Sequence, residues 1–217
     1  MRHPRSAAPV FLLLLPSVLA IAGGWAVVSV ENPPEFGVAG TTLPLRFAVR
    51  QHGVTPLKDL QPVIEARSGS QEVRIAAKET GDPGTYVASL VLPESGSWSI
   101  TIRSGFGPSK LTLLPLPVIP RAAKPPAPLF EVERGRVLFV AKGCVGCHVR
   151  NELGGAEDAP NFGPDLTGKR FEKTFLSRWL ADPGSMGPPR YDKGPMPNPH
   201  LTGVEIAALS VYLNSPR

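Results

Sequence analysis

The stretch "KGCVGCHVR", residues 142–150, contains both cysteines of the 217-residue chain. Two residues separate Cys144 from Cys147, and His148 follows directly. A C-x-x-C pair can form a redox disulfide, supply half of a zinc site or anchor a haem group. A zinc site needs four ligands, and the sequence has no second cysteine pair. A thioredoxin-like pair needs a βαβ setting, whereas this motif ends an amphipathic helical pattern.

His148 decides between these interpretations. In C-x-x-C-H, both thiols form thioether bonds to haem, and the adjacent imidazole binds the iron as an axial ligand. We therefore expect one covalently bound haem c, anchored by Cys144 and Cys147, with His148 on the iron.

The second axial position has three candidates downstream, Met186, Met196 and His200. Met196 lies in "GPMPNP", which resembles the M-P segment that delivers the distal ligand in class I cytochromes c. The resemblance implies Met196 as the second iron ligand. Met186, His200 and an open position remain as alternatives.

Residues 130–217 resemble the same family in other respects. The segment "FGPDL", 162–166, is similar to the one whose proline carbonyl accepts the N–H of the haem-binding histidine. This implies that role for Pro164 and a place against the haem for Leu166. Such a bond orients the imidazole and strengthens it as a ligand. The family also crosses its first and last helices with a glycine against an aromatic ring, and Gly135 and Tyr212 match that pair.

The pattern of apolar residues in this region is helical. It predicts helices within 130–143, 172–183 and 202–215, and Thr202 with Glu205 forms a capping-box signature for the last one. The expected unit is an all-α cytochrome c domain over residues 130–217.

The preceding residues alternate with period two, as in "LPLRFAVR", 43–50. Six or seven such runs, separated by turns, predict an antiparallel β-sandwich over 31–114 with Phe47, Tyr86 and Trp98 in its core. The stretch "GDPGTYVASLVLPESGSWSIT", 81–101, resembles the signature of YtkA-like and FixH-type extracytoplasmic domains. That resemblance implies an immunoglobulin-like fold.

Two further segments indicate how the domains are connected and in which compartment they lie. Six prolines in "PLPVIPRAAKPPAP" predict an extended linker over 115–129. Arg2 and Arg5 precede an apolar run, Val10–Val30, which as a helix would rise about 31 Å and span a bilayer. Residues 1–30 are therefore expected to be a transmembrane signal anchor, or a signal peptide cleaved after Ala20-Ile21-Ala22. Either places the domains on the periplasmic side of a bacterial cytoplasmic membrane.

Charge excludes one class of partner. The net charge is +5, but 31–114 holds eight basic and eight acidic residues and 130–217 holds eleven and ten. No clustered basic surface is expected, and hence no nucleic-acid binding.

Histidine and methionine together fill both axial positions of the iron, which favours one-electron transfer over catalysis. We expect a membrane-tethered carrier between respiratory-type redox complexes, or their haem subunit, rather than an enzyme. One alternative is a copper-trafficking or oxidase-assembly protein, although 31–114 holds a single histidine, His52, and no methionine or cysteine. A second alternative is a haem enzyme with a displaceable distal ligand.

Overall fold

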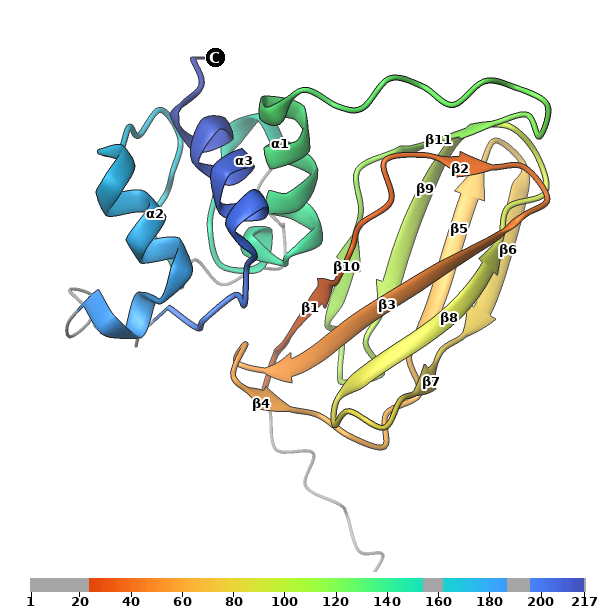
Figure 1. Cartoon of the computed structure of the whole chain (residues 1–217). Coiled ribbons are helices and arrows are strands. Elements are labelled where there is room, and N and C mark those ends of the chain that lie inside the picture. The colour runs from red at the N-terminus through yellow and green to blue at the C-terminus, as the bar shows by residue number, and fades with distance from the viewer. Residues whose placement is uncertain (1–23, 154–161, 187–195, 217) are drawn as a thin grey trace, which may run out of the picture.

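The computed structural model describes residues 24–153, 162–186 and 196–216. A β-rich part comes first and a helical part follows, as predicted, and the two lie side by side (Figure 1). The strands are β1 (Ala26–Val30), β2 (Gly37–Val38), β3 (Thr42–Gln51), β4 (Thr55–Pro56), β5 (Val63–Ser68), β6 (Gln71–Ala76), β7 (Lys78–Glu79), β8 (Thr85–Val91), β9 (Gly96–Arg103), β10 (Lys110–Thr112) and β11 (Leu116–Ile119).

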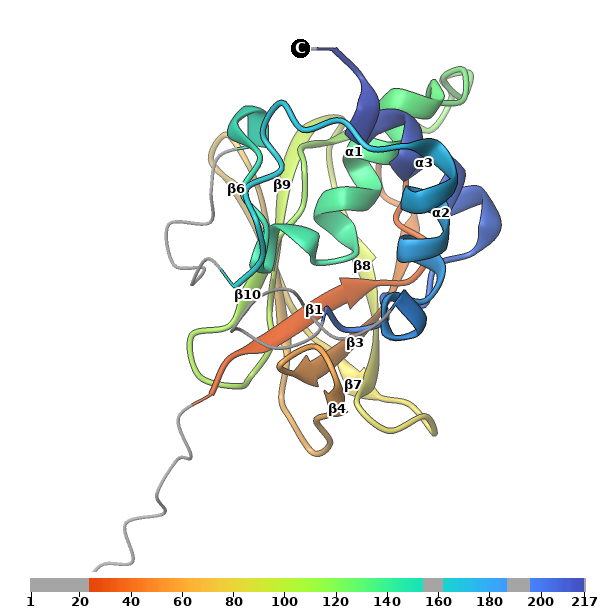
Figure 2. The same cartoon turned by 90° about the vertical axis from the view of Figure 1, so that its left-hand side faces the viewer.

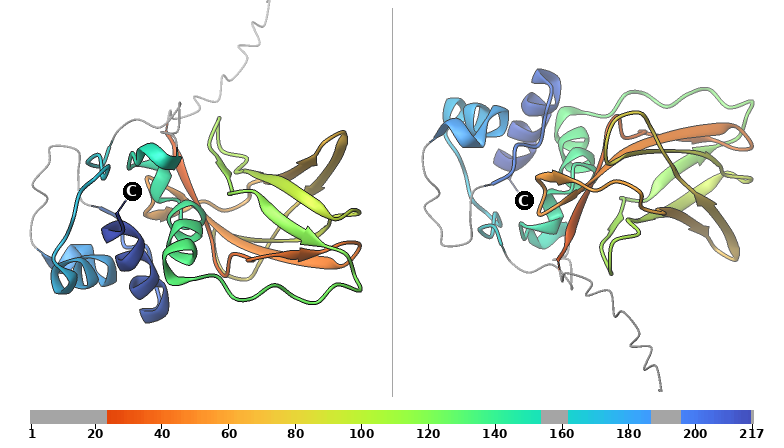
Figure 3. Two further views of the ribbon diagram at one scale, coloured as in Figure 1. Left: turned by 90° about the horizontal axis from the view of Figure 1, so that it is seen from above. Right: turned by 90° about the horizontal axis from the view of Figure 1, so that it is seen from below.

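These strands form two sheets that pack face to face (Figure 3). The first has the order β1-β3-β8-β7, with β4 also on β3, and the second has the order β2-β11-β9-β5-β6, with β10 also on β9. Every pairing among the described residues is antiparallel except that of β11 with β2, which is parallel.

The side-chain alternation of β3 explains how the sandwich closes. Leu45, Phe47 and Val49 point into the core and are completely or almost completely buried. Tyr86 on β8 lies opposite Phe47 in the register, and their ring centroids are 5.9 Å apart. Tyr86 and Trp98 are also fully buried, so the three predicted core aromatics are confirmed.

The expected helix over Val10–Val30 is wrong for the part that the structure describes. Ala26–Val30 forms β1, which pairs with β3, and Val28 and Val30 are buried in the sandwich core. β-branched residues favour a strand over a helix, and "AVVSV" contains three. Residues 1–23 lie outside the described residues, and no helix in the described ranges is long and apolar enough to cross a membrane.

The proline-rich connection also differs from the expectation. Leu116–Ile119 forms β11, and Leu116 and Val118 are buried in the sandwich, so the first residues of the expected linker belong to the β-rich part. The chain then runs without helix or strand through 120–130 and returns along the sandwich to the helices (Figure 1). The segment does not hold the two parts away from each other.

Within the described residues of the helical part, 130–153, 162–186 and 196–216, the structure has three α-helices and three short 3₁₀ segments. They are α1 (Glu131–Ala141), η1 (Cys144–Gly146), η2 (Asn151–Leu153), α2 (Lys173–Ala181), η3 (Pro183–Met186) and α3 (Gly203–Asn214). The three predicted helices are confirmed, and so is the capping box of Thr202 and Glu205 at the start of α3.

Helices α1 and α3 cross in close contact at Gly135. A Cβ at Gly135 would lie 2.2 Å from the carbonyl oxygen of Ala208 and 2.5 Å from the Cβ of Tyr212. The crossing therefore requires glycine at this position, and it is formed by the pair matched from the sequence.

The two parts share apolar packing. Val140 and Ala141 at the end of α1 belong to the same buried cluster as the sandwich core. Trp25, just before β1, stacks on Phe162 with ring centroids 4.7 Å apart. In Figures 1 and 2, β1 is the part of the sandwich that runs beside the helices. The sandwich and the helices are therefore packed directly on each other.

Candidate functional site

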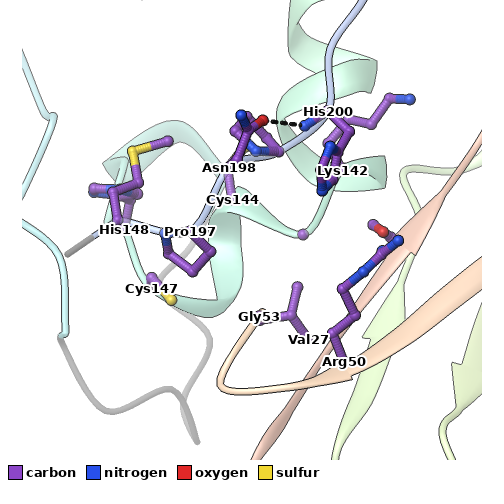
Figure 4. Close-up of a pocket in the computed structure, with 14 residues that line it drawn as sticks. Val27, Arg50, Gly53, Lys142, Cys144, Cys147, His148, Pro197, Asn198 and His200 are labelled. Atoms are coloured by element: carbon purple, nitrogen blue, oxygen red, sulfur yellow. Dashed lines mark hydrogen bonds between the residues drawn. The ribbon is translucent and has the colours of Figure 1, made fainter. Parts of the chain in front are cut away.

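The cysteine motif lies where α1 ends against β1. Gly143 adopts a left-handed conformation with φ of +77°, which favours glycine after a helix, and its N–H donates to the carbonyl of Val140 at 2.9 Å. The chain then turns through η1, and the N–H of His148 donates to the carbonyl of Cys144 at 2.9 Å. This turn brings Cys144, Cys147 and His148 into one pocket (Figure 4).

His148 is held by the backbone of the segment 162–166. Its Nδ1 lies 3.0 Å from the carbonyl oxygen of Pro164 and donates a hydrogen bond to it. Burial lowers the pKa of His148, and the bond to Pro164 opposes this only in part. The imidazole is therefore neutral with its proton on Nδ1, which leaves Nε2 as the nitrogen that can bind a metal ion.

Gly163 supports the same ring from the side. A Cβ there would come within 2.4 Å of the Cε1 of His148 and 2.5 Å of its Nδ1. The N–H of Gly163 also donates to the carbonyl of Cys147 at 2.9 Å. Gly163 belongs to the segment "FGPDL", but nothing in the sequence pattern indicated its contact with His148.

Both thiols are protonated at neutral pH. Burial, helped by the neighbouring Cys147, raises the pKa of Cys144 to about 12, and burial raises the pKa of Cys147 to about 11. Redox-active C-x-x-C pairs have a lowered thiol pKa. The site therefore lacks the electrostatics of a thiol–disulfide centre.

Met196 lines the same pocket as His148, whereas Met186, at the end of η3, does not. The indole Nε1–H of Trp179 on α2 donates to the sulfur of Met196 at 3.2 Å. His200 also lines the pocket, but its side chain is exposed. The structure thus brings Met196 and His200, of the three candidates for the second axial position, to the side of His148.

Leu166 lies behind the pocket rather than in its lining. It is buried in the cluster that joins α1, α2 and α3, and Met196 packs on this cluster. Its N–H donates to the carbonyl of Val149 at 2.9 Å, which ties the segment 162–166 to the residues after His148.

Lys142, which helps to line the pocket, forms an ion pair with Glu205. The ammonium of Lys142 lies 2.6 Å from a carboxylate oxygen of Glu205, and both side chains are largely buried. Burial opposes the ionisation of Glu205, but Lys142 and the N–H of Thr202 outweigh it, and the pKa of Glu205 is lowered. The pair joins the end of α1 to the start of α3.

Another ion pair holds the residues that follow the motif. The guanidinium of Arg150 is buried, pairs with Glu152 and lies 4.3 Å from the ring centre of Tyr212. It also donates to the carbonyl of Tyr212 at 3.2 Å and to that of Leu213 at 3.3 Å. Arg150 therefore binds carbonyl groups that the end of α3 leaves without helical partners.

The β-rich part supplies one side of the pocket. We call this side the sandwich wall, and it consists of Val27, Ser29, Arg50 and Gly53. A sequence analysis that treats the two parts separately has no signal for it, because these residues lie about ninety or more positions before the cysteines.

Comparison with known proteins agrees with this geometry. Residues 132–216 match the family model described as Cytochrome c. The match supports a c-type cytochrome domain at the C-terminus. Such a domain implies covalently bound haem c. A search of curated proteins found no match.

Similarity to solved structures is weak. A superoxide reductase (neelaredoxin) from Ignicoccus hospitalis has 16% identity and a TM-score of 0.30, over 42% of this chain and 80% of that chain. The ZirS C-terminal domain has 11% identity and a TM-score of 0.31, over 54% and 83%. Scores this low do not support a shared fold, and the resemblance of the sandwich to YtkA-like and FixH-type domains stays a prediction.

The residues of the pocket fit haem c by their chemistry. Two protonated thiols, a neutral imidazole with Nε2 available and a thioether sulfur line one pocket between the helices and the sandwich wall. In the described ranges 24–153, 162–186 and 196–216, no three His, Cys, Asp or Glu side chains form a group that could hold another metal ion.

Proposed function

We propose that this protein transfers single electrons by means of one haem c bound in its C-terminal cytochrome domain. The observation that carries the proposal is the His148 arrangement: the ring donates from Nδ1 to Pro164 and shares a pocket with both cysteines and Met196. When bound, haem c supplies a one-electron redox centre.

Each pocket residue has a role in this proposal. Cys144 and Cys147 would hold the group through thioether bonds, and His148 and Met196 would supply the side chains that bind the iron. Pro164 fixes the tautomer and orientation of the imidazole. With both axial positions filled by the protein, no position on the iron is left for a substrate, which favours a carrier over an enzyme.

The proposed location is outside the bacterial cytoplasmic membrane, where haem c is attached. Arg2 and Arg5 before an apolar run support export. Because β1 begins at Ala26, residues 10–25 are what remains of that run, and as a helix they would rise about 24 Å, less than a bilayer's hydrocarbon core. This favours cleavage after Ala22 over a membrane anchor. The proposed partners are redox proteins or a membrane redox complex.

The test begins with the full-length protein, produced in a bacterium that attaches haem c. We expect one covalent haem per chain and, in the oxidised protein, the weak far-red absorption band of methionine ligation. Met196→Ala removes the band, whereas the matched variant Met186→Ala keeps it. Absence of covalent haem contradicts the proposal. Rapid carbon monoxide binding by the reduced native protein contradicts the carrier function and favours the haem enzyme.

A further inference from the structure

The sandwich wall contacts the haem-binding motif itself. A Cβ at Gly143, the residue before Cys144, would lie 2.6 Å from Cγ1 of Val27 and 2.7 Å from the carbonyl oxygen of Val28. The backbone of the motif is therefore in van der Waals contact with β1.

The sandwich wall also contacts the segment that carries Met196. A Cβ at Gly53 would lie 2.7 Å from Cγ of Pro197, the residue after Met196. Gly53 has φ of +74° in the turn between β3 and β4, a conformation that favours glycine. The sandwich thus touches the chain next to Cys144, the first proposed haem anchor, and next to Met196, a proposed axial ligand.

Arg50 is the charged member of the sandwich wall. Its side chain is half-buried, and Figure 4 shows it extending from β3 toward the side of the pocket lined by Lys142 and His200. In the part of the chain that the structure describes, its guanidinium has no hydrogen bond or ion pair.

The charge of Arg50 is not balanced within the pocket. Lys142 is neutralised by Glu205, whose carboxylate oxygen lies 2.6 Å from the ammonium. No aspartate or glutamate of the described ranges lines the pocket. By contrast Arg46, four residues earlier on β3, pairs with Glu31 and Asp82. Among the described residues that line the pocket, Arg50 of the sandwich wall thus carries a positive charge that no acidic group neutralises.

We propose that the β-sandwich is part of the haem site and that Arg50 raises the reduction potential of the haem. This inference rests on the proposed function. Reduction adds one negative charge at the iron, so a fixed positive charge beside the site favours the reduced form. Val27 and Pro197 add apolar side chains to the pocket lining, and apolar surroundings strengthen the electrostatic effect of a nearby charge.

The experiment compares four full-length holoproteins: the native protein, Arg50→Gln, Arg50→Lys and Arg74→Gln. Arg74 is exposed on β6 and is not in the sandwich wall, so Arg74→Gln removes the same charge far from the pocket. The ratio of reduced to oxidised haem is read from the visible spectrum at a series of applied potentials. The far-red band is recorded for each variant, to check that Met196 still binds the iron.

At a fixed potential, we expect Arg50→Gln to lower the ratio of reduced to oxidised haem by about threefold to tenfold. Arg50→Lys keeps the charge and stays within about twofold of the native ratio, and Arg74→Gln does not change it. All variants keep the far-red band.

Three outcomes contradict the inference: an unchanged ratio in Arg50→Gln, an equal fall in Arg74→Gln, or a fall that is accompanied by loss of the far-red band. Failure of the proposed function would be a different result, the absence of covalent haem from the native protein. The two failures can therefore be distinguished.

Discussion

Gly163 lies against the flat side of the His148 imidazole, with an ideal Cβ position only 2.4 Å from the ring's Cε1. The ring, its bond to Pro164 and the glycine form one unit, because any side chain at position 163 must push the imidazole away from its hydrogen-bond partner. The orientation of the haem-binding histidine therefore depends on a residue that does not touch the metal.

Gly163→Ala tests this dependence. Overpacking of about 1–3 kcal/mol is expected, relieved by rotation of His148 away from Pro164. The variant should contain less covalent haem than the native protein, and the haem that it does bind should have a weakened far-red band. Gly203→Ala is the matched control, since a Cβ at Gly203 meets nothing within 4 Å. Equal haem content and equal spectra in the two variants would argue against the role of Gly163.

Gly135→Ala should destabilise the fold although alanine is the better helix former. In an open helix the change would stabilise by about 1 kcal/mol. Here the added methyl would meet the carbonyl of Ala208 at 2.2 Å, so α1 and α3 must separate. We expect a net loss of about 1–3 kcal/mol in the free energy of unfolding, measured by denaturant titration. Gly81→Ala, with nothing within 4 Å, should change it by less than about 1 kcal/mol.

Arg150→Met should lower the free energy of unfolding by about 2 kcal/mol, because it removes the ion-pair partner of Glu152 and the guanidinium donors to the carbonyls of Tyr212 and Leu213. Arg136→Met is the control. Arg136 is partly exposed and lies 3.9 Å from Glu133, a surface pair worth about 0–1 kcal/mol. Comparable losses in both variants, measured by thermal or denaturant unfolding, would show that the buried cation has no special role.

The pair of Lys142 and Glu205 predicts a dependence of stability on pH. The folded-state pKa of Glu205 lies below its unfolded value, so ionised Glu205 stabilises the fold above about pH 4.3, and this stability is lost as the pH falls through the folded-state pKa. The difference in unfolding free energy between the native protein and Glu205→Gln should thus be largest near neutral pH and shrink below about pH 4.3.

Exposed Glu133 provides the comparison for this effect. Glu133→Gln removes a carboxylate that lies 3.9 Å from the guanidinium of Arg136 at the surface, so the stability of this variant should differ little from that of the native protein at any pH. If the difference in unfolding free energy between the native protein and Glu205→Gln grew toward low pH, the direction assigned to the pKa shift of Glu205 would be wrong.

Processing of the N-terminus can be checked by mass spectrometry of the protein recovered from cells. Cleavage after Ala22 would leave a mature chain that begins at Gly23, three residues before β1. Retention of residues 1–22 in the membrane fraction would instead favour the signal anchor.

The sequence was sufficient where structure depends on local pattern. Alternation in 43–50 predicted β3, and the Thr202 and Glu205 spacing predicted the start of α3. The contact between Gly135 and Tyr212 was predicted from the family resemblance. Nothing in the sequence itself requires two residues so far apart in the chain to lie against each other.

Prediction was wrong where one pattern fits two structures. An apolar run that follows basic residues can be a membrane helix, or it can be a signal peptide followed by a buried strand. In this sequence, only the three valines of "AVVSV" at the end of the run favour the strand. Similarly, the prolines at 115 and 117 suggested a linker, yet Pro117 lies within β11, beside Leu116 and Val118 in the core. Tertiary packing decided both cases.

The sandwich wall could not be predicted, because it depends on how two units dock. Gly53 and Gly143 gave no signal beyond their turn conformations, and only the structure shows that each accommodates an atom of the other unit. Arg50 was interpreted as the exposed side of an alternating strand, which it would be in a sandwich standing alone.

The shared apolar cluster has a practical consequence for dissecting the molecule. Val140 and Ala141 lie in α1, inside the segment that the Cytochrome c family model covers, yet they pack with the core of the sandwich. A fragment cut at the boundary of that family match would expose these side chains to water next to Cys144. Such a fragment would be prone to self-association. Its absorption spectrum and reduction potential would describe a haem site that lacks the sandwich wall. Studies of the haem should therefore use the intact chain.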